Sequence, residues 1–236
     1  MLLTSDLRVI SSLAFCGFLI TIRFAFFYPA DLGLLFDLEI HTTGGTTLLF
    51  FVWNLFLATL PYFFSRLADL TSSQVITGIL LLLWLLFLPN APYVISDLKH
   101  LRPRAHVPYW FDVITFTSCA LTGLYLGALA VINVMRQTNW SAWNSGAKWL
   151  SLLLFPLCGF GIFLGRVLRW NSWDAFSRPH HLFVDIWSNF ANPQVQPTIL
   201  LFVFGYGLAL LLGTWLVRKL GSNNSNTSCN YFPPLG

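Results

Sequence analysis

The sequence predicts an all-α membrane protein, a polytopic helical bundle of about six transmembrane helices. Of its 236 residues, 56% are hydrophobic and only 9% are charged, whereas soluble domains carry roughly 25% charged residues. The mean hydropathy is +0.68. The apolar residues gather in continuous blocks of about 20, the length that crosses a hydrocarbon core of roughly 30 Å. A membrane barrel would instead show alternating segments of about ten residues.

We expect the spans, in chain order, over 8–28, 46–65, 75–95, 110–134, 147–168 and 197–217. The first span is too long for the apolar region of a signal peptide, and PADLG after it lacks a small-residue cleavage site, so we expect it to stay uncleaved. The fourth span contains GLYLG at 123–127, a motif for close helix packing. Residues 1–220 are expected to form a single transmembrane domain, and the polar segment 221–236 a disordered tail.

An even number of spans places both termini on one side and the loops 28–45, 96–109 and 169–196 on the other. Lys and Arg are equally numerous on the two sides. The loop 28–45 contains neither, and the first span usually dominates orientation, so we expect cytoplasmic termini. The side that holds the termini is expected to carry little beyond simple anchors.

The net charge of +4 and the pI near 9.0 do not indicate a nucleic-acid partner. The basic residues flank apolar segments, where membrane orientation and contact with anionic lipid explain them. Cys16, Cys119 and Cys158 lie inside apolar segments and are expected to pack as small hydrophobic residues. No P-loop, GxGxxG, GxSxG or HExxH fingerprint stands in a convincing context, so no cofactor is expected.

Pro89 and Pro92 predict a break near 88–93, because each removes a backbone donor and disfavours helix in the preceding residue. In lipid the carbonyls freed by the break need partners, and Asn90 is a candidate donor. Two interpretations are open. The broken helix lines a substrate site, or PNAPY turns the chain at the interface with Tyr93 in the aromatic belt.

Asp97 and His100 stand three residues apart after this break. On a short helix they share a face, where they orient one another or hold a metal between them. Alternatively, Ser96 or Asp97 caps that helix and His100 meets solvent. His180 and His181 are adjacent and point in different directions on a helix, so they form a poor chelating pair, and no metal site is expected.

Arg166 and Arg169 also stand three apart, after a GxxxG motif at 161–165 that favours close helix packing. Two guanidinium groups on one face suit phosphate or carboxylate. The alternatives are that they reach the lipid headgroups as anchors, or that they pair with Asp97, Asp112 or Asp174 and join helices.

Two further polar features have structural explanations. In the segment NSWD, Asn171 is expected to cap a helix while Asp174 returns the bond, as in a capping box. Arg23 lies near the outer end of the first span and is expected to extend to the interface.

The chain resembles the bacterial membrane-protein family catalogued as domain of unknown function 1361. The resemblance rests on NLFLATLPY at 54–62, WLLFLPNAPYVISDLKHL at 84–101, WFD at 110–112 and CGFGIFLGRVLRWNSWD at 158–174. It implies a multi-pass protein of the bacterial cell membrane and brings no established activity, cofactor or catalytic residues.

The sequence therefore predicts a polar pocket on one side of the bundle, which binds an anionic headgroup, a small anion or a partner protein. An enzyme that acts on a lipid or lipid-linked substrate by Asp/His acid–base or metal chemistry is the alternative, although no recognised nucleophile or metal constellation stands out. A transporter is a second alternative, disfavoured because most span centres lack charges. The candidate site residues are Asn90, Tyr93, Asp97, His100, Asp112, Arg166, Arg169, Asn171 and Asp174.

Overall fold

A computed structural model describes residues 2–27, 49–103, 107–137 and 145–229. The prediction of an all-α fold is confirmed, because the described residues form helices and connecting turns without a strand. The helices are α1 (Leu2–Phe27), α2 (Leu49–Leu70), α3 (Gln74–Phe87), α4 (Asn90–Tyr93), the 3-10 helix η2 (Val94–His100), α5 (Tyr109–Gln137), α6 (Ser145–Arg166), α7 (Asp174–Ser177), α8 (Pro179–Ala191) and α9 (Gln196–Cys229).

Among the described residues, five segments are long and apolar enough to cross a membrane, namely Ser5–Ala25, Phe50–Leu70, Gln74–His100, Tyr109–Gln137 and Gln196–Gly221. The expected span at 147–168 falls on α6, whose described apolar part, Leu153–Arg166, is shorter. These lengths and compositions are those of an integral membrane protein.

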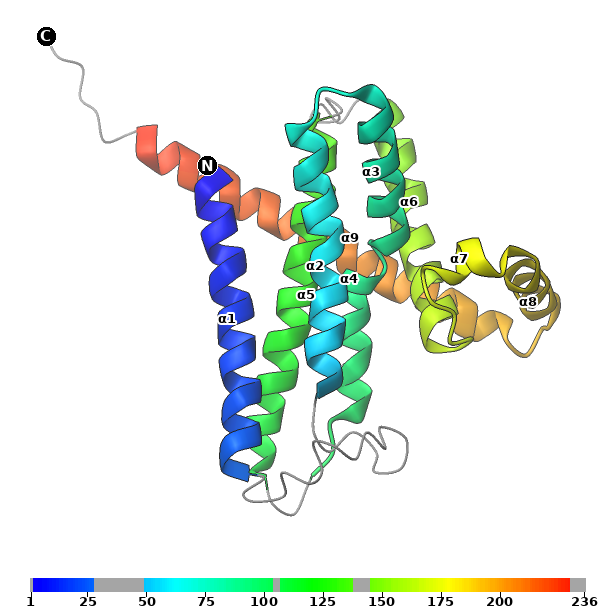
Figure 1. The fold of residues 1–236 in the computed structure, drawn as a ribbon, viewed down its shortest axis with the longest axis horizontal. Coiled ribbons are helices and arrows are strands. Elements are labelled where there is room, and N and C mark those ends of the chain that lie inside the picture. The colour runs from blue at the N-terminus through cyan, green and yellow to red at the C-terminus, as the bar shows by residue number, and fades with distance from the viewer. Residues whose placement is uncertain (1, 28–48, 104–106, 138–144, 230–236) are drawn as a thin grey trace, which may run out of the picture.

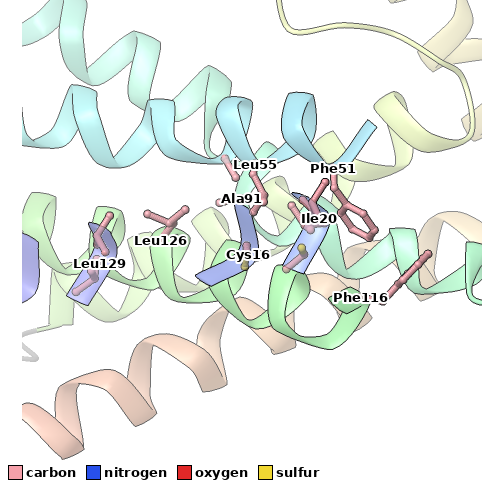
Figure 2. Close-up of a cluster of buried hydrophobic side chains, with 12 residues drawn as sticks. Cys16, Ile20, Phe51, Leu55, Ala91, Phe116, Leu126 and Leu129 are labelled. Atoms are coloured by element: carbon pink, nitrogen blue, oxygen red, sulfur yellow. The ribbon is translucent and has the colours of Figure 1, made fainter. Parts of the chain in front are cut away.

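Helix α5 forms the centre of the bundle (Figure 1). In its most apolar stretch 72% of the residues are buried, compared with 22–28% in the corresponding stretches of the other four apolar spans, and the helix packs against α1, α2, α9, α4 and η2. Figure 2 shows part of the core, where Cys16 and Ile20 of α1 and Phe51 of α2 meet Phe116 and Leu126 of α5. The outer faces of the spans expose Leu, Phe and Trp, as expected for surfaces in contact with lipid.

Glycines let the helices approach closely at the centre of the fold. A Cβ on Gly123 of α5 would lie 2.5 Å from the carbonyl oxygen of Ala91 in α4. On α6, a Cβ on Gly161 would lie 2.5 Å from Pro89 Cγ, and one on Gly159 2.5 Å from the Phe202 carbonyl oxygen of α9. GLYLG and GxxxG are therefore packing motifs, as predicted, and they hold α5 and α6 directly against the proline break.

The end of the bundle that carries the N-terminus was expected to carry little beyond simple anchors, and this prediction is wrong. Arg66 of α2 pairs with Asp6 of α1 (3.1 Å) and lies 3.8 Å from Asp69 in its own helix. Asp69 is also 3.7 Å from Arg136 of α5, and the Tyr62 hydroxyl donates to Asp6. These contacts join α1, α2 and α5 by polar side chains.

Helix α9 packs along α6 and crosses the bundle obliquely behind α5 (Figure 1). It continues to Cys229 and so extends into the segment that we expected to be a tail. Residues 230–236, the remainder of that segment, lie outside the described residues.

Candidate functional site

The break at PNAPY interrupts the third span as predicted. Helix α3 ends at Phe87, and a new helix begins at Asn90. The Asn90 side chain donates from Nδ2 to the Phe87 carbonyl (3.0 Å), which confirms its expected role. Ser172 supplies a second donor, because its hydroxyl lies 3.3 Å from the Leu86 carbonyl oxygen. Two carbonyls at the break, those of Leu86 and Phe87, are thus satisfied within the protein, as lipid favours.

The chain does not leave the bundle after the break. Helices α4 and η2 continue beside α5, so 94–100 is helical and not a surface loop. Proline is tolerated in the first turn of a helix, where no intrahelical donor is lost, which allows a helix to restart directly at PNAPY. As a result Asp97 is buried, with 1% of its surface exposed.

Asp97 and Arg166 form a buried ion pair between η2 and α6. Arg166 Nη1 lies 3.1 Å from Asp97 Oδ1, and their side chains are 11% and 1% exposed. Asn54 of α2 donates to the other carboxylate oxygen at 2.7 Å. The pairing of Arg166 with Asp97 was one of the alternatives open from the sequence.

Arg166 also joins α6 to the helix that follows the break. It donates to the Tyr93 hydroxyl (3.0 Å) and to the Ser96 carbonyl (3.0 Å), and its guanidinium lies 5.2 Å from the centre of the Tyr93 ring. A buried arginine needs both a counter-charge and hydrogen-bond acceptors, and this arrangement supplies one counter-charge and two neutral acceptors, while Nε has no hydrogen-bond partner among the described residues.

Arg169 is separated from Arg166 by the end of α6. The helix stops at Arg166, and Arg169 adopts a left-handed backbone conformation (φ 61°). The Trp170 N–H then bonds back to the Leu164 carbonyl at 3.0 Å. Arg166 is therefore turned into the protein while Arg169 is exposed. The two guanidinium groups do not share a helical face, contrary to the prediction from their spacing.

The NSWD segment forms half of the expected capping box. The Asp174 carboxylate accepts the Asn171 N–H at 2.8 Å, as predicted. The Asn171 side chain does not cap a helix, because its Nδ2 donates to the same carboxylate and α7 begins only at Asp174. Asp174 pairs with Arg178 at 2.8 Å. The Arg178 hydrogen bond and the Asn171 N–H lower the pKa of Asp174 to about 2.

Asp112 belongs to a different ion pair. Its carboxylate lies 2.7 Å from Arg23 Nε, and both side chains are 1% exposed. The prediction that Arg23 extends to the interface is wrong. The prediction considered only the position of Arg23 near the end of the span. Asp112 of α5 lies beside Arg23, and the two side chains form an ion pair. An Arg23 side chain extended to the interface would lose this ion pair.

The histidines do not assemble a metal site within the described residues. The His100 ring packs against Phe50 of α2, with ring centres 5.6 Å apart. His180 and His181 are exposed at the start of α8, and their ring planes are 86° apart, consistent with different directions. The acidic residues of the loop 28–45 lie outside the described residues, as does His106.

A cavity of about 280 Å³ lies between α2, the proline break, the end of α6 and the NSWD segment. Asn90, Tyr93 and Asn171 are candidate residues that line it. Its wall also includes side chains that the sequence reasoning missed: Trp53, Asn54, Ser172 and Trp173. Asn54 carries a signal of its own, because it is an amide inside an apolar span.

PNAPY and RWNSWD are therefore neighbouring walls of one cavity. Asn90 Nδ2 joins them directly through a 3.3 Å hydrogen bond to the Ser172 hydroxyl. Arg166 donates to the hydroxyl of Tyr93, which lines the cavity, and Arg166 pairs with Asp97. Neither Asp97 nor Arg166 is part of the cavity lining within the described residues.

The fold and this cavity define a helical integral membrane protein with a cavity at a broken span. The chain belongs to the family described as protein of unknown function (DUF1361), whose family model matches residues 53–212. That match covers the break, the ion pair of η2 with α6, and the NSWD segment. No curated protein and no solved structure matches the chain.

Proposed function

We propose that the protein binds the polar headgroup of a membrane lipid in the cavity between the proline break and the NSWD segment. The observation that carries the proposal is the cavity itself, which combines amide and hydroxyl groups with tryptophans in a chain whose outer faces contact lipid. Small-molecule sites usually have such linings, with a few polar groups among aromatic ones.

Positive charge borders the cavity without lining it. The Arg178 guanidinium lies 5.1 Å from the centre of the Trp170 ring, and Trp170 is part of the wall. Arg169 precedes Trp170 and lies close enough to Lys99 for the two charges to interact. Arg178 is also paired with Asp174, so it is the exposed Lys99 and Arg169 that favour a lipid with a phosphate near its headgroup.

The enzymatic alternative has less support from the contacts. Asp97 and Asp174 each pair with an arginine, whereas a general base needs a carboxylate or imidazole in reach of a substrate. We further propose that both termini lie in the cytoplasm of a bacterial cell, which places the cavity towards the outer side of the inner membrane. The absence of Lys and Arg from the loop 28–45 supports this orientation.

The test is native mass spectrometry of the purified chain and of Trp53→Ala and Trp173→Ala. Both side chains line the cavity and are half exposed (55% and 46%), so truncation leaves the core intact. Loss of an aromatic anchor weakens binding by about 1 kcal/mol or more, about fivefold. The matched control is Trp187→Ala, an exposed tryptophan of α8 outside the cavity lining.

We expect a specific lipid adduct on the wild type and on Trp187→Ala, and a loss of about fivefold or more on the two cavity variants. Equal adducts on all four proteins would show that the lipid binds elsewhere and would overturn the proposal.

A further inference from the structure

The described lining of the cavity contains no charged side chain. Its polar members are amides, hydroxyls and indoles, so recognition there depends on neutral hydrogen bonds and contact with aromatic rings. A cavity of about 280 Å³ is near the lower limit of small-molecule sites, which span roughly 300–1,000 Å³. It suits one headgroup and not a whole lipid.

Each amide nitrogen of the lining makes at least one structural contact. Asn90 Nδ2 uses both hydrogens, on the Phe87 carbonyl and the Ser172 hydroxyl. Asn54 Nδ2 donates to Asp97, and Asn171 Nδ2 donates to Asp174. No donor in the described part of the chain is bonded to the Oδ1 of Asn54, Asn90 or Asn171, so these oxygens can accept from a ligand, and Asn54 and Asn171 each keep a second Nδ2 hydrogen that can donate.

Neutral donors are present in the same lining. Tyr93 accepts from Arg166, which leaves its own hydroxyl hydrogen to donate. Trp53 and Trp173 add indole N–H groups, which can only donate. A ligand that fits this mixture both donates and accepts, as a hydroxyl group does. An ammonium group only donates, and a phosphate only accepts.

The aromatic residues of the lining also favour a hydroxyl-rich ligand. Trp53, Tyr93, Trp170 and Trp173 present apolar ring surface to the cavity, which suits the C–H faces of a polyol or sugar. Arg178 lies against the Trp170 ring and is paired with Asp174, and Asp185 accepts the Trp170 indole N–H, so the charges around this ring are balanced.

We propose that the lipid headgroup is hydroxyl-rich, a glycerol or hexose unit whose hydroxyl groups bond to the Asn54 and Asn90 amide oxygens. This inference rests on the proposed function, since it names the class of headgroup that the cavity takes. Glycerol of an anionic phospholipid and hexose of a glycolipid share this chemistry.

The test is a native mass-spectrometry titration of the delipidated full-length chain with lipids of identical acyl chains. Phosphatidylglycerol and phosphatidate form one matched pair, which differs in the glycerol hydroxyls. Monoglucosyl diacylglycerol and diacylglycerol form a second pair, which differs in the sugar. Phosphatidylethanolamine serves as the ammonium probe. Each titration is repeated with Trp53→Ala, Trp173→Ala and the control Trp187→Ala.

We expect the hydroxyl-bearing member of at least one pair to bind about fivefold or more tightly than its partner and than phosphatidylethanolamine, as one or two net hydrogen bonds allow. The two cavity variants should lose this preference, and Trp187→Ala should keep it. If only phosphatidylglycerol binds more tightly than its partner, the headgroup is a glycerol unit. If only monoglucosyl diacylglycerol does so, the headgroup is a sugar.

Two different failures are distinguishable. Equal affinity within both pairs and for phosphatidylethanolamine, still weakened by Trp53→Ala and Trp173→Ala, would overturn the hydroxyl-rich class and leave headgroup binding in place. Affinities that neither cavity variant changes would overturn both the class and the proposed function.

Discussion

Replacement of Arg166 by methionine tests the contact that joins α6 to the broken span. Methionine keeps most of the volume of the side chain and removes all three polar contacts, to Asp97, to the Tyr93 hydroxyl and to the Ser96 carbonyl. The Asp97 carboxyl would then have 1% of its side chain exposed and Asn54 as its remaining hydrogen-bond partner.

Removal of one partner from a buried ion pair destabilises a protein by about 3–5 kcal/mol, because a buried charge is left uncompensated. Arg166 is 11% exposed, and we therefore expect about 3 kcal/mol for Arg166→Met, the lower end of this range. The double variant Asp97→Asn/Arg166→Met removes the buried charge as well. It should recover at least about 1.5 kcal/mol relative to the sum of the single variants.

The measurement is equilibrium unfolding in mixed micelles, titrated with SDS and followed by circular dichroism. Arg169→Met is the matched control, since this arginine is three residues away and exposed, and it should change the free energy of unfolding by at most about 0.5 kcal/mol. A loss below about 0.5 kcal/mol for Arg166→Met, or additive single variants, would refute the stabilising role of the pair.

Three further variants probe the break and the NSWD segment. Gly161→Ala would place a methyl group 2.5 Å from Pro89 and should lower the free energy of unfolding in micelles by about 1–3 kcal/mol. The control Gly78→Ala, with no atom within 4 Å of the added methyl group, should be neutral or stabilising. Equal effects of the two variants would contradict the close packing at Gly161. Asn90→Leu should cost about 1–3 kcal/mol, because the α3 carbonyl that it serves is left unpaired, and an unchanged free energy of unfolding would contradict that assignment. Asp174 has its pKa lowered to about 2, so its contribution to stability is present above the unfolded pKa of about 3.9 and is lost as the pH falls through 2. A carboxyl titration by NMR should show a midpoint near 2, and a midpoint near 3.9 would contradict the pairing with its arginine.

The sequence predicted the features that depend on neighbouring residues. Continuous apolar blocks become helices because a backbone in lipid must satisfy its own hydrogen bonds. The interruption at PNAPY follows from its prolines. The role of Asn90 follows because the Phe87 carbonyl, three residues earlier, needs a hydrogen-bond donor. The Asp174 carboxylate on the Asn171 N–H is likewise a local contact.

The contacts that build the cavity are not local, and the sequence left them open or missed them. Ser172 reaches a carbonyl 86 positions earlier in the chain, and the choice of Asp97 as partner of Arg166 depends on how α6 packs against η2. Arg169 could not be placed from its spacing, because the end of α6 reverses the chain before it.

Two predictions failed because they considered one charge at a time. Arg23 was assigned to the interface from its position in the helix, without the carboxylate that α5 supplies. The end with the N-terminus was described by its basic residues alone. Counting the acidic residues would have shown Asp69 three positions after Arg66, a spacing that allows ion pairing within a helix.

Photocrosslinking from position 53 tests most directly whether the cavity holds a lipid headgroup. A photoreactive phenylalanine analogue replaces Trp53, at the cavity wall, and in a second protein it replaces Trp187, an exposed residue of α8. After irradiation in native membranes, mass spectrometry identifies the attached lipids. We predict one enriched class of lipid at position 53 and the bulk membrane mixture at position 187. The same bulk mixture at both positions would contradict a headgroup site in the cavity.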